Sequence, residues 1–263
     1  IPMSNISKNH PRYKSLIARE KLVDASNNGL LAHSAMIAHG RGEAFDYLLG
    51  EETSKSAKLA IKEVAYRLNK SKNPIISVNG NTAVLAGEDL IRIAAVLECS
   101  IEINLYYRTE ERISKLLQLL NEQKNKVSKE ECPDGWIGDW DKSVNSVRLL
   151  GQENDGLIIG LEGPRAICSS EGIQRSDTVL VPLEDGDRCE ALVALGKEVL
   201  VIDLNPLSRT ARKASVTIVD EVSRAANLIL NEIIIKDYKI KEWDNESTLR
   251  DALEIISKSM NKI

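Results

Sequence analysis

The feature that most constrains the fold of this chain is a pair of short apolar runs that each end in a charged loop. Residues 179–181 lead into the acidic turn 183–188, and residues 199–202 lead into the loop 203–206. The segment between the two runs has a helical pattern. Two parallel strands joined by a helix place both loops at one edge of a sheet, where open α/β folds bind their ligands. Carboxylates and arginines in these loops predict a charged ligand with a metal, and a nucleotide phosphate fits best.

Strand-like and helical segments alternate through the middle of the chain. This alternation is typical of a parallel sheet that helices cover on both faces. We expect strands at residues 74–78, 101–105, 179–181, 199–202 and 216–219. We expect helices at residues 12–28, 43–49, 54–70, 87–99, 109–120, 222–235 and 247–260. The polar segment 121–145 is expected to be a surface loop or an insertion, with a lid as one interpretation.

These elements predict a single α/β domain over residues 1–263. Its core is a Rossmann-like, mostly parallel sheet with helices on both faces, spanning about residues 73–220. A helical N-terminal segment precedes the core at about residues 11–70, and C-terminal helices follow it at about residues 221–263. Length alone would also allow two small domains.

Composition argues against several classes of function. The net charge is −4 and the basic residues are mixed with acids, so we expect no nucleic-acid partner. One Phe and three Trp offer little aromatic surface for stacking on single strands. No apolar run approaches the ~18 residues of a membrane span, and no signal-peptide pattern is present, so we expect a cytoplasmic protein without membrane contacts. The four cysteines are widely spaced, and we expect them to be free thiols.

The segment Gly40-Arg41-Gly42 begins like a dinucleotide fingerprint but lacks the last glycine and follows a helical pattern. We therefore expect a turn whose backbone N–H groups approach an anion at the N-terminus of the next helix, with Arg41 adding a charge-assisted contact. The alternative is a tight turn between helices with a surface arginine. His39 adjoins this turn and is the histidine we consider as a catalytic residue. Walker A spacing and the GxSxG motif are absent from the sequence.

Polar residues follow three successive strands. Asn79 ends the first expected strand, and Asn104 and Arg108 follow the second. Asp185 and Asp187 follow the third, where they could hold Mg²⁺ or a ribose hydroxyl. The alternatives are an ordinary turn after the first strand and an Asx-type cap at the third.

The last two loops carry further charged groups. Arg188 could pair with a phosphate, and Asp203 at a strand end fits a hydrogen bond to a ribose. Arg209 and Arg212 share one face if the chain is helical there, and could clamp a polyphosphate. A solvated helix face is the alternative.

Several blocks of sequence resemble archaeal phosphopantothenate synthetase, also called 4-phosphopantoate–β-alanine ligase. They are HPRY with the following Arg19-Glu20, IAHGRGEAFDYLLGE, ISVNGN, EINLYYRTEER, VLVPLEDGDR and DLNPLSRTAR. The blocks are long and lie between His10 and Arg212, whereas residues 121–176 carry little of the resemblance.

The resemblance implies a homodimeric, ATP-dependent ligase of coenzyme A biosynthesis with a Rossmann-like fold. Such an enzyme joins 4-phosphopantoate to β-alanine and releases AMP and diphosphate, which implies an acyl-adenylate intermediate. Its ATP contacts correspond to Arg19, Arg41, Asp185, Gly186, Asp187, Arg188, Asp203, Leu204 and Asn205.

Individual roles within the resemblance are our interpretation. We expect Arg19, Arg41 and Arg188 to bind phosphate charge, with Arg209 beside them. Mg²⁺ is assigned to Asp185 or Asp187, the nucleoside to Asp203 and Asn205, and the phosphopantoate and β-alanine pocket to Asn79, Asn104 and Arg108. Two other classes remain open at this point: a nucleotide-dependent enzyme such as a kinase or dehydrogenase, and a non-catalytic nucleotide-binding dimer.

Overall fold

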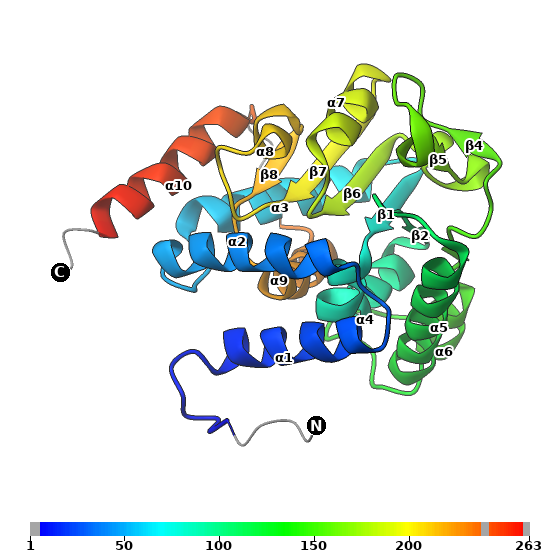
Figure 1. Ribbon diagram of the computed structural model, residues 1–263, viewed down its shortest axis with the longest axis horizontal. Helices are drawn as coiled ribbons and strands as arrows, with labels where there is room; N and C mark the ends of the chain where they lie inside the picture. Colours follow the sequence, from blue (N-terminus) through cyan, green and yellow to red (C-terminus); the bar gives the residue numbers. More distant parts are fainter. Residues whose placement is uncertain (1–5, 238–241, 260–263) are drawn as a thin grey trace.

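The centre of the molecule is a six-stranded, fully parallel sheet with the order β3-β2-β1-β6-β7-β8 (Figure 1). The computed structural model describes residues 6–237 and 242–259. The chain winds outward from β1 on one side and from β6 on the other, so the switch point of the topology lies between these two strands. The strands are β1 (Pro74–Val78), β2 (Ser100–Ile103), β3 (Leu149–Leu150), β6 (Thr178–Pro182), β7 (Glu198–Ile202) and β8 (Val216–Ile218). The expected Rossmann-like α/β fold is confirmed.

The central strands have continuous apolar sequences because helices bury both of their faces. All five residues of β6 are buried, and so are the last four of β7. The two strands pair in register from Thr178 opposite Glu198 to Pro182 opposite Ile202, so they end level with each other. Their following loops therefore emerge side by side.

Alternate residues of the strands pack into two separate cores. Ile76, Leu180 and Leu200 face the larger core, whereas Val179 and Val199 face the smaller one. The larger core is built with α3 (Lys55–Lys70), α4 (Gly80–Leu97), α5 (Glu110–Val127), α6 (Trp140–Ser146) and α9 (Val222–Ile235). The smaller core is built with α7 (Gly186–Ala194), the short helix η2 (Ser170–Gln174) and the sheet of β4 (Gly156–Leu157) with β5 (Ile167–Cys168).

Two N-terminal helices lie beyond the carboxyl ends of the strands (Figure 1). Helix α1 (Tyr13–Asn27) was expected with nearly these bounds, but α2 (His33–Leu49) is one continuous helix of 17 residues. The expected turn at Gly40-Arg41-Gly42 is therefore wrong. A glycine inside a helix costs about 1 kcal/mol relative to alanine, and a Cβ at Gly42 would lie in ordinary contact with Cδ1 of Leu204, at 3.4 Å.

Two other boundaries also differ from the sequence prediction. Helix α4 begins at Gly80, seven positions earlier than expected, because the Asn79 side chain caps it by accepting a hydrogen bond from the backbone N–H of Thr82 at 3.0 Å. The segment 121–145 is not one continuous loop. Helix α5 continues to Val127, and Trp140 on α6 is buried and donates a hydrogen bond to the carbonyl of Val127 at 3.1 Å.

The remaining helices follow the sequence prediction closely. Helix α9 has the expected bounds, and α10 (Asn245–Ser259) covers the expected C-terminal helix, of which Met260 lies outside the described residues. A short helix, α8 (Arg209–Lys213), starts at Arg209. The four cysteines are free thiols, as expected.

Glu102 on β2 anchors the segment before β6 to the sheet. Its fully buried carboxylate accepts hydrogen bonds from the backbone N–H groups of Ser169 at 3.0 Å and Ile173 at 2.7 Å. Burial raises the pKa of Glu102, and these two N–H groups act in the opposite direction.

We expect Glu102→Ala to lower the free energy of unfolding by about 3 kcal/mol, because it leaves two buried N–H groups unpaired. Urea unfolding at neutral pH measures this. Glu198→Ala, which removes a half-exposed partner of Arg67, is the control and is expected to cost less than about 1 kcal/mol. Equal losses in the two variants would contradict the anchoring role of Glu102.

Candidate active site

A cavity of about 750 Å³ lies at the carboxyl ends of the strands, where the switch point predicts a ligand site. Loops that are distant in sequence form its wall. They are the N-terminal segment with α1 and α2, the start of α4, the loops after β2, β6 and β7, and the start of α9. The cavity therefore joins most of the loops that the sequence analysis selected.

Arg41 places a positive charge on the wall of this cavity. It lies on the cavity wall and is exposed, and it makes no hydrogen bond or ion pair with the residues that the structure describes. Arg41 acts electrostatically on Asp203: burial raises the pKa of Asp203, and the positive charge of Arg41 is among the groups that oppose this rise. An unpaired guanidinium on a cavity wall is suited to an anionic ligand.

The loop after β7 is held by its own side chains. Asp203 accepts a hydrogen bond from the backbone N–H of Asn205 at 2.9 Å and from the hydroxyl of Ser208 at 2.5 Å. Asn205 in turn accepts from the backbone N–H of Leu207 at 3.0 Å. Leu204, between them, lies on the cavity wall. Leu204 thus brings this loop to the cavity, whereas Asp203 and Asn205 hold the loop's shape and do not line the cavity.

His39 projects from the same helix as Arg41 but from a different face. It lies on the cavity wall, and its Nε2 atom is buried without a hydrogen-bond partner among the described residues. Burial lowers the pKa of His39 below its ordinary value, although Glu43 and Glu221 act to raise it. The imidazole is therefore neutral at neutral pH.

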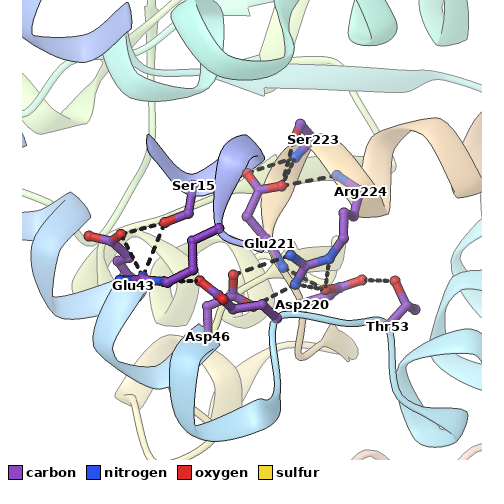
Figure 2. Close-up of polar contacts among 10 residues, drawn as sticks. Ser15, Glu43, Asp46, Thr53, Asp220, Glu221, Ser223 and Arg224 are labelled. Carbon is purple, nitrogen blue, oxygen red and sulfur yellow. Dashed lines mark hydrogen bonds and ion pairs between the residues drawn. The ribbon is translucent and has the colours of Figure 1, made fainter. Parts of the chain in front are cut away.

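Arg19 does not lie on the cavity wall in this structure. Its guanidinium donates to both oxygens of Glu43, at 2.8 and 2.9 Å, and so ties α1 to α2. Glu43 also accepts a hydrogen bond from Ser15 at 2.5 Å (Figure 2). Burial raises the pKa of Glu43, but the hydrogen bonds from Arg19 and Ser15 outweigh it and leave the pKa lowered.

Asp185 and Asp187 lie at the N-terminus of α7. The Asp185 side chain caps the helix by accepting from the backbone N–H of Asp187 at 3.4 Å, which supports the Asx-type alternative. Arg165 donates to both carboxylates, at 2.7 Å to Asp185 and 2.8 Å to Asp187. Arg209 also pairs with Asp187 and packs on Gly186, where a Cβ would lie 2.6 Å from its Nε and would force this side chain to shift.

This pairing bears on the expected magnesium site. Within residues 6–237 and 242–259, no three His, Cys, Asp or Glu side chains gather as a metal cluster. Two carboxylates at the mouth of a phosphate site can still hold Mg²⁺ when substrate phosphates complete its shell, but here Arg165 would first have to move away. Magnesium at Asp185 and Asp187 therefore stays a prediction.

Arg188 is a buried structural residue in this fold. It is 4% exposed, donates to Asn104 Oδ1 at 2.5 Å and to the carbonyl of Arg165 at 3.0 Å, and lies 3.4 Å from Glu184. Asn104 in turn donates to Ser77 at 3.0 Å. Neither Arg188 nor Asn104 reaches the cavity wall. The geometry thus favours a positioning role for both, in place of the direct ligand contacts expected from the sequence.

Arg108 and Asn79 also use their side chains within the protein. Arg108 donates to the carbonyl of Gly151 at 2.5 Å and to Asn154 at 2.6 Å, away from the cavity wall. Asn79 lies on the wall, but it caps α4 and donates to the carbonyl of Leu183 at 2.9 Å. The expected substrate pocket of Asn79, Asn104 and Arg108 is not assembled as a single group of free side chains.

A buried cluster of charges not singled out from the sequence supports one end of the cavity. Figure 2 shows Arg224, on α9, between Asp46 of α2 and Asp220. The guanidinium donates to Asp46 at 2.5 and 3.2 Å and to Asp220 at 2.6 and 3.0 Å, while Thr53 donates to Asp220 at 2.6 Å. Burial raises the pKa of Asp46, and Arg224 opposes that rise. Asp220 follows β8, so a search for polar residues directly after the expected strands could have identified it.

Arg165 is a second residue of the site that the sequence alone does not mark. It lies in the region of little resemblance, 20 residues before Asp185, and its guanidinium also stacks over the ring of Tyr106 at 5.0 Å. No local pattern marks it, because its partners come from other loops.

We expect Arg224→Met to lower the free energy of unfolding by about 3–5 kcal/mol, because Asp46 and Asp220 would remain buried without their cation. Thermal unfolding measured by calorimetry tests this. The control is Arg250→Met, which removes an exposed helix pair with Glu246 and is expected to cost less than about 0.5 kcal/mol. A wild-type transition in Arg224→Met would contradict this account of the cluster.

In the part of the chain that the structure describes, no helix is both long enough and apolar enough to cross a membrane. A family model for phosphopantothenate/pantothenate synthetase matches residues 56–259. A 4-phosphopantoate–β-alanine ligase of Thermococcus onnurineus is 42% identical over 270 aligned residues, covering 99% of this chain and 95% of the relative. Ligases of the same name from Thermococcus kodakarensis and Methanosarcina mazei are 42% and 38% identical, covering 95% and 98% of this chain and 92% and 96% of those proteins. With its switch-point cavity and these full-length relatives, the chain belongs to the phosphopantothenate/pantothenate synthetase family.

Proposed function

We propose that this protein is an ATP-dependent ligase that joins 4-phosphopantoate to β-alanine, forming 4′-phosphopantothenate for coenzyme A biosynthesis. One observation carries the proposal: the sequence blocks that resemble such ligases, although spread between residues 10 and 212, contribute residues to one cavity. The names of relatives that align over nearly the whole chain support the same reaction. A homodimer in the cytoplasm is part of the proposal and rests on the resemblance.

The proposed reaction has two steps. The carboxylate of 4-phosphopantoate attacks the α-phosphate of ATP, forming an acyl-adenylate and expelling diphosphate. The amine of β-alanine then attacks the acyl carbon and expels AMP. Both steps crowd anions together, so positive charge and N–H donors contribute most of the stabilisation.

The side chains around the cavity divide between these steps. Arg41 binds phosphate charge, and the loop of Asp203, Leu204 and Asn205 holds the nucleoside. Arg19 and Arg209 would have to leave Glu43 and Asp187 before they could join Arg41. Mg²⁺ would screen the phosphates, with Asp185 and Asp187 as its protein ligands. His39, neutral and unpartnered, accepts the proton that β-alanine must lose before its amine can attack.

The central experiment measures AMP formation from ATP and 4-phosphopantoate, with and without β-alanine. We expect β-alanine-dependent AMP and diphosphate, and label from carboxylate ¹⁸O of 4-phosphopantoate in the AMP. ADP as product would indicate a kinase-like enzyme, and label only in phosphate would indicate an acyl-phosphate route. ATP binding without turnover would indicate the non-catalytic alternative.

We expect Arg41→Ala to lower kcat by ~10² or more, because it removes charge that stabilises the transition state. Steady-state kinetics of AMP release measure this, with circular dichroism to confirm folding. Arg175→Ala is the matched control, since Arg175 is exposed and pairs only with Glu171 among its described neighbours. Near-normal turnover of Arg41→Ala would remove Arg41 from the site.

The pH dependence tests His39. Burial lowers its pKa below the ordinary value of about 6.5, so the neutral, proton-accepting form persists above that lowered pKa and is lost below it. We expect kcat to fall on the acidic side of pH 6.5, and His39→Asn to lower kcat by ~10²–10⁴ and to abolish that dependence. An unchanged pH profile in His39→Asn would contradict the assignment.

A further inference from the structure

Asn81 has a fixed orientation beside the cavity. It is the second residue of α4, is 7% exposed and lies on the cavity wall. Its Nδ2 donates a hydrogen bond to the carbonyl of Ala35 on α2 at 2.9 Å. The reversed amide would bring two oxygens together, so the Nδ2 bond sets the position of Oδ1.

The Oδ1 atom of Asn81 is buried and has no hydrogen-bond partner among the described residues. A buried acceptor left unpaired costs about 1–3 kcal/mol. Asn81 borders the cavity, and a bound ligand that donates a hydrogen bond to Oδ1 would remove this cost. The Asn81 amide is therefore a candidate acceptor for a donor on a bound substrate.

The residues around Asn81 indicate which kind of hydrogen-bond donor fits there. Leu31, Ala35 and Leu85 border the cavity here and belong to one apolar cluster. Leu31 packs so closely on Gly80 that a Cβ there would lie 2.6 Å from its Cδ2. A neutral hydroxyl on a branched hydrocarbon fits both the apolar wall and the acceptor, and it loses less hydration on this wall than a charged ammonium group does.

We propose that Asn81 Oδ1 accepts a hydrogen bond from the hydroxyl of 4-phosphopantoate, beside the carboxylate that reacts. The dimethyl carbon of the same substrate packs against Leu31, Ala35 and Leu85. This inference rests on the proposed function and makes Asn81 a residue that determines substrate specificity. A site that pairs a substrate hydroxyl rejects the analogue that lacks it much more strongly than an apolar pocket does.

The test compares 4-phosphopantoate with its 2-deoxy analogue, 3,3-dimethyl-4-phosphonooxybutanoate, in the AMP-release assay. We expect wild-type kcat/KM to be lower for the analogue by ~10² or more. In Asn81→Leu, the ratio of kcat/KM for 4-phosphopantoate to kcat/KM for the analogue is expected to fall below about tenfold, because leucine can pair with neither substrate. The KM for ATP is expected to be retained. Asn121→Leu, at an exposed position of α5 where Nδ2 also bonds a backbone carbonyl, is the matched control and keeps the wild-type ratio.

Each outcome has a distinct meaning. A wild-type ratio near one overturns the role of Asn81, and this result does not depend on the variant folding. An unchanged ratio in folded Asn81→Leu also overturns it, and a selective rise in the KM for β-alanine would show that the donor is the ammonium. If the wild-type enzyme forms no AMP with 4-phosphopantoate, the proposed function itself fails.

Discussion

The parallel pairing of β1 with β6 is the constraint on which the rest of this structure depends. The two strands run side by side from Pro74 opposite Thr178, and the chain leaves them in opposite directions. Their carboxyl ends therefore open a space that no crossover helix fills. Two side chains reinforce this junction: Asn79 bonds to the carbonyl of Leu183, and Thr82 donates to the carbonyl of Pro182 at 3.2 Å. The cavity exists because these two strand ends are held together while their helices diverge.

The helices α1 and α2 complete the site from the opposite side, and ion pairs hold them there. Glu43 links α2 to α1, and the pairing of Asp46 with Arg224 links α2 to the start of α9. Burying Asp46 and Arg224 is costly, and that cost is compensated only when both partners are in place. The same contacts leave Arg41 and His39 on the cavity wall without competing partners among the described residues. Charge pairing thus separates the side chains that hold the site from those that can act on a ligand.

Sequence patterns predicted a helix or strand well where the apolar residues of that segment alone determine its structure. Helix α9 and the strands β6 and β7 appear nearly where expected, because runs of buried apolar residues have few alternatives. The prediction of a turn at Gly40-Arg41-Gly42 was wrong because α2 runs through both glycines, whose cost of about 1 kcal/mol each relative to alanine does not end the helix. The prediction of a surface loop or insertion over residues 121–145 was wrong at both ends, because α5 continues to Val127 and α6 begins at the buried Trp140.

The sequence by itself determined the fold class, the edge of the sheet that carries the site, and the loops that approach it, because periodicity and strand-end polarity are local properties of the chain. Only the tertiary structure decided which polar side chains are free. Arg188 and Asn104 bond to each other across 84 positions, and Arg165 occupies Asp185 and Asp187 from a segment without any recognisable pattern. Hydrogen bonds and ion pairs between distant segments depend on where the chain returns in space. An arginine that holds a strand end and an arginine that faces a ligand therefore look alike in the sequence and differ only in the fold.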